Sequence, residues 1–385
     1  MPHYVTRGQI PGKRHVQFRQ PDGSLYKEQV MGTKGFSGVQ SILYHANAPT
    51  AVSSWADLGP IRRDYEEPGA LRHRHFRTAD AEAGGDVVSN RTLLMGNDDV
   101  AILIARPTKP MDFFYRNGEG DEVLFIHEGE GKLETNYGTL PYRPGDYLVI
   151  PIGTTWRMVP GPGSPQRVLV IESSGTVEPP KRYRNEYGQL MEHSPYCERD
   201  IRPPTELETH HESGDFEVRV RAHGRLTAHY YDFHPLDVVG WDGYLYPYAF
   251  SIYDFEPITG SIHQPPPVHQ TFQGPNFVIC SFVPRLFDYH PQAIPAPYNH
   301  SNVDSDEVLY YVEGNFMSRR GIEVGSVTIH PAGLPHGPHP GTAEASIGKS
   351  RTDELAVMLD TFRPLRIARD AMGEDPGYMG SWVAH

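Results

Sequence analysis

The pattern of hydrophobic and polar positions along the chain is that of a β protein. Short segments rich in Val, Ile, Leu, Tyr and Phe end at Gly, Pro, Asp or Asn, for example at residues 122–127, 146–150, 167–171, 217–221 and 326–330. Strands separated by turns at short intervals are typical of sandwiches and barrels. Helical periodicity is weak, and its best candidates are residues 53–58, 367–372 and part of 182–191. We therefore predict a mostly all-β fold with few short helices.

Two blocks of sequence occur in both halves of the chain with identical spacing. The first block reads Tyr115-x-Asn117, four residues, Glu122, six residues, Gly129, and returns as His300-x-Asn302, four residues, Glu307, six residues, Gly314. The second block reads Gly145, five residues, Pro151-x-Gly153-x-x-Trp156, and returns as Gly325, five residues, Pro331-x-Gly333-x-x-His336. The matching order and spacing predict two copies of one β-barrel unit.

The second copy carries residues that can hold a metal ion. Residues two apart on a strand point to the same face, so His300 and Asn302 can both face a barrel interior. Glu307 begins the next strand, and His336 follows a later bend. Two imidazoles and one carboxylate on one face leave coordination positions open, as in the facial triad of non-heme Fe(II) oxygenases. A lone histidine on a strand is usually structural, but these three lie inside spaced blocks, so we predict a metal site at His300, Glu307 and His336.

The first copy has Tyr115 and Trp156 where the second has its metal-binding histidines. We therefore interpret the first unit as structural and expect one metal ion per chain. Two other histidine groups, at residues 72–75 and 210–211, are interpreted as polar turns exposed to solvent.

These blocks resemble the two sequence motifs of the cupin barrel. The resemblance implies two cupin-type, jelly-roll-like barrels in one chain, that is, a bicupin. Residues 1–177 would hold an N-terminal segment and a degenerate barrel without metal, and residues 178–385 the barrel with the metal site. A linker is expected near residues 177–183, where Glu-Pro-Pro-Lys interrupts the strand pattern. Cupins also host Mn, Zn and Ni chemistry and plain ligand binding, so the motif indicates a metal site rather than one reaction.

Longer segments resemble those of the homogentisate 1,2-dioxygenase family. They are Pro-Tyr-Asn-His-Ser-Asn at 297–302, Glu307, Leu-Pro-His-Gly-Pro at 334–338, residues 117–124, parts of 25–44, and Asp-Val-Val-Gly-Trp at 237–241. The resemblance implies one Fe(II) per chain, with O₂ as co-substrate. It further implies that homogentisate is opened to maleylacetoacetate in tyrosine and phenylalanine catabolism, and that the chains form homo-oligomers, as trimers pairing into hexamers.

The same resemblance points to residues around the substrate. His330 falls where the family places a histidine near the substrate, which predicts a catalytic role, although a buried structural histidine fits equally well. Asp242 stands where better-known members have a histidine that steers substrate protons. An Asp with a pKa raised by burial could accept a phenol proton, and it could equally be a turn residue. Phe316 aligns with a substrate-contacting tyrosine. Further substrate-binding candidates are Tyr298, His339 and Asn302.

Composition narrows the function classes. Lys and Arg number 35 against 48 Asp and Glu, which gives a net charge of −13. Such an acidic chain does not favour binding to nucleic acid or to an anionic membrane. The two cysteines, Cys197 and Cys280, are too few for a disulfide framework. Because the first residues contain no apolar run of the signal-peptide type, we expect a cytoplasmic protein.

Two alternatives to homogentisate cleavage stay open at this point. One is a cupin dioxygenase for another para-dihydroxy aromatic, such as gentisate or a hydroquinone. The other is a bicupin that binds metal without catalysis. Ligands present in only one of the two copies favour an enzyme, because a storage protein needs no open triad.

Overall fold

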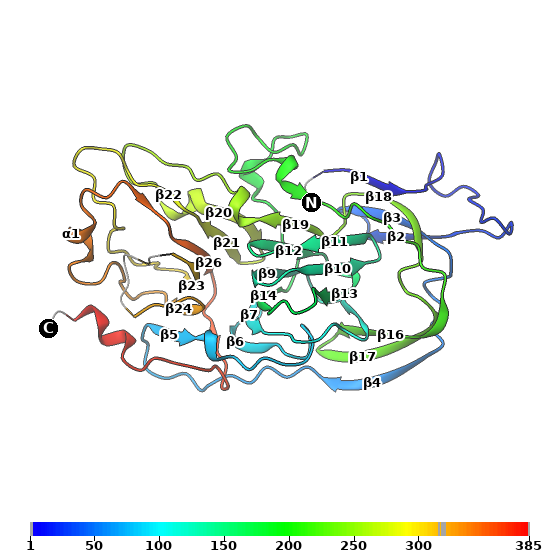
Figure 1. The fold of residues 1–385 in the computed structure, drawn as a ribbon, viewed down its shortest axis with the longest axis horizontal. Helices are drawn as coiled ribbons and strands as arrows, with labels where there is room; N and C mark the ends of the chain where they lie inside the picture. The colour runs from blue at the N-terminus through cyan, green and yellow to red at the C-terminus, as the bar shows by residue number, and fades with distance from the viewer. Residues whose placement is uncertain (1–2, 315, 317–320, 384–385) are drawn as a thin grey trace.

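The structure is a computed structural model that describes residues 3–314, 316 and 321–383, and it is mostly β (Figure 1). Two of its sheets hold the strands that carry Glu122 and Glu307 of the two copies of the repeat. One has eight described strands in the spatial order β15 (Ile201–Arg202), β19 (Tyr248–Ser251), β12 (Asp146–Ile150), β9 (Glu122–Glu128), β14 (Arg167–Ser173), β7 (Val100–Ala105), β6 (Thr92–Gly96) and β27 (Arg366–Ile367). The other has six described strands in the order β20 (Gln270–Gly274), β21 (Phe277–Phe282), β26 (Leu355–Thr361), β23 (Asp306–Glu313), β24 (Ser326–His330) and β5 (Arg74–Arg77).

The remaining described strands form three further sheets, of seven, four and two strands. The seven-stranded sheet has the order β11 (Gly138–Tyr142), β10 (Gly131–Thr135), β13 (Thr155–Pro160), β8 (Phe114–Asn117), β16 (Ser213–Ala222), β17 (Arg225–Phe233) and β4 (Ser54–Pro60). The four-stranded sheet has the order β1 (Val5–Gly8), β18 (Val238–Gly243), β3 (Gln40–His45) and β2 (Lys27–Gly32). The last sheet pairs β22 (Arg285–Leu286) with β25 (Arg351–Thr352).

Helices are few and short in the described part of the chain. They are α1 (Thr342–Ser346) and the 3-10 turns η1 (Thr78–Asp80), η2 (Lys181–Tyr183), η3 (Glu198–Asp200), η4 (Ile252–Asp254), η5 (Pro266–His269) and η6 (Tyr378–Trp382). Within the same residues no helix combines the length and apolar character needed to cross a membrane. The predicted mostly all-β fold with few short helices is confirmed in these residues, and all five segments named as strands are strands.

The helix candidates from the sequence were wrong in two places. Residues 54–60 form β4, an edge strand hydrogen-bonded to β17, and residues 366–367 form β27, paired with β6. Of residues 182–191, only the first two belong to the short turn η2. Pairing with a neighbouring strand decided the structure of these segments, because their weak periodicity supplied no apolar stripe for a helix to bury.

The repeat reappears in the strand order. In the eight-stranded sheet β12, β9, β14, β7 and β6 lie side by side, and in the six-stranded sheet β24, β23, β26, β21 and β20 lie in the same order. Tyr115 and Trp156 form a backbone pair between β8 and β13. His300 and His336, at the matching places, are joined by an equivalent antiparallel bridge. Corresponding motif positions therefore have corresponding backbone partners in the two units.

The two large sheets share one apolar core. Val123 and Phe125 of β9 belong to the same buried cluster as Val308 and Tyr310 of β23, and the rings of Phe125 and Tyr310 lie 6.4 Å apart. Side chains alternate across a strand, so the odd-numbered residues of β23 point away from this core. Each fully buried apolar side chain of this kind contributes about 1.5–3 kcal/mol to folding. The shared core thus fixes which face of β23 is turned toward the second unit.

The two units predicted as residues 1–177 and 178–385 exchange strands. β16 pairs with β8, and β19 pairs with β12, so segments after residue 178 extend sheets of the first half. In the other direction, β5 from the first half extends the six-stranded sheet beside β24. Figure 1 shows the same interleaving, with the cyan β5 among the orange and yellow strands near the C-terminus.

An arginine occupies the first unit at the position that corresponds to the predicted metal site. Arg91 lies 2.8 Å from Glu122 and 2.7 Å from Glu172, and all three side chains are buried. Arg221 contacts the second oxygen of Glu172 at 2.6 Å. Burial disfavours the charged form of Glu172, yet Arg91 and its neighbouring arginines hold the pKa of this carboxyl at about 2. The buried guanidinium of Arg91 therefore lies between the two carboxylates of the first unit, and Arg221 also pairs with Glu172.

Replacement of Arg91 should destabilise the protein strongly. In Arg91→Met two buried carboxylates lose their shared cation, and removing one partner of a buried ion pair costs about 3–5 kcal/mol. A matched control is Arg369→Met, because Arg369 is mostly exposed in its pair with Asp64 and exposed ion pairs contribute little to stability. Chemical denaturation of both variants measures the difference. Equal unfolding free energies for the two variants would contradict this assignment.

Candidate metal centre

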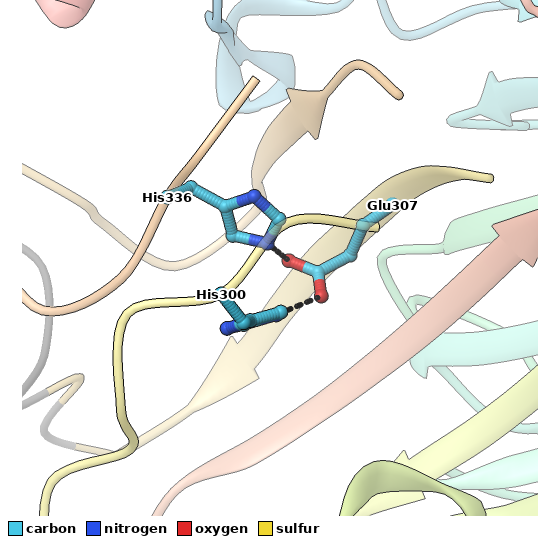
Figure 2. A group of neighbouring side chains, drawn as sticks. All are labelled: His300, Glu307 and His336. Carbon is cyan, nitrogen blue, oxygen red and sulfur yellow. Dashed lines mark ion pairs between the residues drawn. The ribbon is translucent and has the colours of Figure 1, made fainter. Parts of the chain in front are cut away.

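The three residues predicted as metal ligands converge in the second unit. His336 Nε2 lies 3.3 Å from Glu307 Oε1, and His300 Nε2 lies 3.6 Å from Glu307 Oε2. One donor atom from each residue falls within 4.8 Å of the other two. Figure 2 shows the two imidazoles approaching one carboxylate from separate segments of the chain. The spacing of the sequence blocks was therefore a sufficient guide to this cluster.

Backbone hydrogen bonds place the two histidines. The amide of His300 donates to the carbonyl of His336, and the amide of His336 donates back to the carbonyl of His300, both at 2.8 Å. Glu307 is the second residue of β23 and faces away from the shared core, as do Leu309 and Tyr311. Rigid backbone thus holds each donor, which is the support that a preorganised site requires.

The ring nitrogens of the two histidines are poised for metal binding. Nδ1 of His300 lies 3.2 Å from the carbonyl of Tyr298, and Nδ1 of His336 lies 3.4 Å from the carbonyl of Leu334. A carbonyl oxygen only accepts, so each Nδ1 carries the proton. Nε2 of each ring faces Glu307 and is the nitrogen that remains for a metal ion. Histidine ligands in metalloproteins are oriented by the same kind of outer hydrogen bond.

Glu307 is kept ionised and is held by a fourth residue. Burial disfavours its charge, but hydrogen bonds from His300, His330 and His336 hold the pKa of this carboxyl well below its usual range. Nδ1 of His330 donates to Glu307 Oε1 at 2.8 Å. On the other side of the ring, Nε2 of His330 lies 3.0 Å from the hydroxyl of Tyr378 in η6. His330 is fully buried and positions the carboxylate.

This donor set fits a divalent transition metal. Two neutral imidazoles and one carboxylate suit Fe, Mn or Zn, and three ligands leave positions for other molecules. Asp360 pairs with Glu307 in register on β26. Burial and the charge of Glu307 raise the pKa of Asp360 to about 7. Asp360 corresponds to Glu172 of the first unit in strand pairing, but it lies 24 positions after His336 whereas Glu172 lies 16 after Trp156, so the spacing of the repeat could not find it.

A cavity of about 140 Å³ opens onto His300 and Glu307. Leu309, Tyr311 and Met358 line it from β23 and β26. A cavity of about 150 Å³ is large enough to hold a benzene ring. The cluster therefore adjoins a space that matches one aromatic ring.

The cavity is also lined by three residues with basic side chains that the sequence did not reveal. They are His263, His269 and Arg285. Nothing in their local sequence indicates a common site, because each comes from a segment of irregular structure or from a two-residue strand.

The predicted substrate residues lie at different distances from this cavity. Tyr298 lines an adjoining pocket that shares His263 with the cavity, and its ring packs on His263 at 4.8 Å. Asn302 donates to Asp360 at 3.4 Å and does not line the cavity. Phe316 is buried with its ring 4.6 Å from that of Tyr311, so it lies behind a lining residue.

Asp242 is not part of the site within this chain. It lies on β18 in the four-stranded sheet, in register with Thr6 and Ile42, and accepts a hydrogen bond from the hydroxyl of Tyr4 at 2.7 Å. The predicted role of Asp242 in proton transfer is corrected accordingly. The physical reason is that its neighbour Trp241 is anchored in the core of the first unit, where its indole donates to the carbonyl of Tyr137.

A C-terminal segment covers the back of the cluster. His339 Nε2 lies 3.0 Å from Ser381 Oγ, and the indole of Trp382 donates to the carbonyl of Gly337 at 3.0 Å. The ring of Trp382 also packs on His73 at 4.9 Å. His339 thus holds the C-terminal segment rather than lining the cavity.

The interpretation of residues 72–75 as an exposed turn was wrong. His73 and His75 are buried, and Arg74 begins β5 beside β24. His73 lies 5.9 Å from the ring of His336. Alternating basic and histidine residues looked polar in the sequence, but His75 of the edge strand β5 and His73 just before that strand are both buried.

Comparison with known proteins shows which family the chain is related to. A family model described as "Homogentisate 1,2-dioxygenase N-terminal" matches residues 41–252. "Putative dioxygenase SSO1533" of Saccharolobus solfataricus is 41% identical, and the match covers 99% of both chains. The homogentisate 1,2-dioxygenases of Bradyrhizobium diazoefficiens and Oryza sativa are 27% and 28% identical over 69% and 74% of this chain, which spans 61% and 63% of theirs. A solved cupin 2 conserved barrel domain protein from Leptotrichia buccalis matches 79% of this chain and 100% of its own, with a TM-score of 0.36 and 8% identity. This chain belongs to the homogentisate 1,2-dioxygenase family.

Proposed function

We propose that this protein is an Fe(II)-dependent dioxygenase that opens the ring of homogentisate to give maleylacetoacetate, in the breakdown of tyrosine and phenylalanine. The observation that carries the proposal is the cluster of His300, Glu307 and His336, of which His300 and Glu307 line a cavity of about 140 Å³. Membership of a dioxygenase family supports the reaction class. One substrate and one O₂ give one product, and both oxygen atoms remain in that product.

His300, Glu307 and His336 would hold the iron, which supplies the electrons and open positions needed to bring O₂ and the aromatic substrate together. The chain itself contributes position and protection. Leu309, Met358 and the prolines at 295 and 297 give the cavity apolar walls that exclude water from one bound ring. His330 keeps the Glu307 carboxylate ionised and fixed, which holds the ligand geometry during turnover.

Removal of one ligand should abolish both metal retention and turnover. In His336→Ala a cluster of three donors becomes two, so we expect metal content to fall from about one per chain to near zero after gel filtration. O₂ uptake with homogentisate should fall to background. A suitable control is His211→Ala, which removes an exposed histidine. Metal analysis by mass spectrometry and an oxygen electrode give the two readouts. Full metal content and turnover in His336→Ala would contradict the assignment.

Loss of the hydroxyl behind His330 should weaken metal binding without removing a ligand. Tyr378→Phe takes away the group that lies 3.0 Å from His330 Nε2. Outer hydrogen-bond partners of metal ligands are worth about 10–100-fold in affinity or activity. Tyr378 acts on Glu307 only through His330, so we expect a loss of up to about tenfold, the lower end of that range, in a competition between the protein and a chelator. Tyr187→Phe, which changes an exposed tyrosine, is the control. An unchanged metal affinity in folded Tyr378→Phe would show that this hydrogen bond has no positioning role.

A further inference from the structure

Arg285 brings a positive charge to the cavity beside the candidate metal ligands. It begins β22, where it pairs with Thr352 of β25, and both residues line the cavity together with His300 and Glu307. Its guanidinium lies 5.4 Å from the ring of Phe282, another lining residue. Among the described residues that line the cavity, Arg285 is the only arginine or lysine.

Arg285 forms no ion pair with a carboxylate in the described part of the chain. Nη1 donates to the carbonyl of Val283 at 3.1 Å. No carboxylate of a described residue lies within ion-pair distance of the guanidinium, although Asp288 and Glu354 line the same cavity. Asp288 lies instead 3.6 Å from His263 Nδ1. Burial lowers the pKa of Arg285 while Glu354 and Asp288 act against it, and an arginine remains protonated in proteins. A partly buried cation without a paired anion is costly, so a ligand that brings the anion gains affinity.

His269 adds a second polar group with unused bonding capacity. It is buried, its ring packs on Phe282 at 4.5 Å, and its Nδ1 has no hydrogen-bond partner among the described residues. Burial first, and then the nearby charge of Arg285, lower the pKa of His269 to about 3, so the ring is neutral at physiological pH. A buried polar atom without a partner is uncommon in folded proteins and indicates a missing ligand or water. The cavity therefore contains two polar groups that a bound anion can satisfy.

We propose that Arg285 binds the carboxylate of the substrate and makes the enzyme specific for anionic over neutral para-dihydroxy aromatics. The proposal rests on the function proposed above and assigns its specificity to one residue. The planar guanidinium matches a carboxylate with two parallel hydrogen bonds. Phe316 does not line the cavity, so it offers no contact to an acid group there.

A matched pair of substrates tests the proposal. Homogentisate and its methyl ester share the ring and both hydroxyl groups and differ in the negative charge. The wild-type protein should prefer the acid in kcat/KM by about 10–100-fold, the range expected for hydrogen bonds to a charged group. In Arg285→Gln the preference should fall close to one, mainly through a higher KM for the acid. Arg285→Lys should keep part of the preference for the acid, because lysine keeps the positive charge but lacks the planar guanidinium that makes two parallel hydrogen bonds.

The control variant is Arg351→Gln. Arg351 lies on β25 opposite Leu286, the neighbour of Arg285, but its side chain is exposed and pairs with Asp353. This variant should keep the wild-type preference. An unchanged preference in folded Arg285→Gln, or a wild-type protein that treats acid and ester alike, would overturn the role of Arg285 while leaving the dioxygenase proposal intact.

A binding measurement separates the two proposals. Phenylacetate carries the carboxylate without the hydroxyl groups, and phenylacetamide is its neutral counterpart. Calorimetry on metal-loaded protein should show about tenfold or tighter binding of phenylacetate in the wild type, lost in Arg285→Gln. If no dihydroxy aromatic is turned over, the proposed reaction fails, and this binding difference still decides the role of Arg285. Equal binding of both probes would exclude Arg285 as a carboxylate site.

Discussion

The packing of the two large sheets against each other is the constraint on which the site depends. Val308 and Tyr310 of β23 are locked into the core that both units share. Because side chains alternate along a strand, this contact turns Glu307, Leu309 and Tyr311 toward the cavity. A shift of β23 by one residue would bury Glu307 in the apolar core and expose Tyr310 to the cavity. The strand can therefore deliver a carboxylate to the metal cluster only in the observed register.

The two units have the same backbone arrangement around a pair of carboxyl groups, but the side chains that surround the carboxyl groups differ. In the first unit, Glu122 and Glu172 face each other across neighbouring strands and share Arg91, and Arg221 also pairs with Glu172. In the second unit, Glu307 and Asp360 hold the same places, and histidines surround Glu307. An arginine fills its site permanently, whereas a metal ion bound by three residues keeps positions open. This difference explains how one copy could become structural while its twin keeps the features of a reactive site.

The residues that could be predicted from the sequence are those that lie at short, fixed spacings within the repeat. His300, Glu307 and His336 were found because each lies at a fixed offset from a glycine or proline that shapes the turns of the repeat. Residues brought in from distant segments could not be found this way. Tyr378 reaches His330 from 48 positions along the chain, and Arg285 belongs to a strand of two residues with no pattern of its own. Asp242 was misplaced for the related reason that its adjacency to Trp241 does not say which sheet the pair joins.

The most direct test of the central claim is a single-turnover reaction of the Fe(II)-loaded protein with homogentisate under ¹⁸O₂. The account predicts one iron per chain, consumption of one O₂ per substrate, and a ring-opened product that carries both labelled oxygen atoms. Protein that binds no iron at His300, Glu307 and His336, or that binds iron and consumes no O₂ with homogentisate, would contradict it.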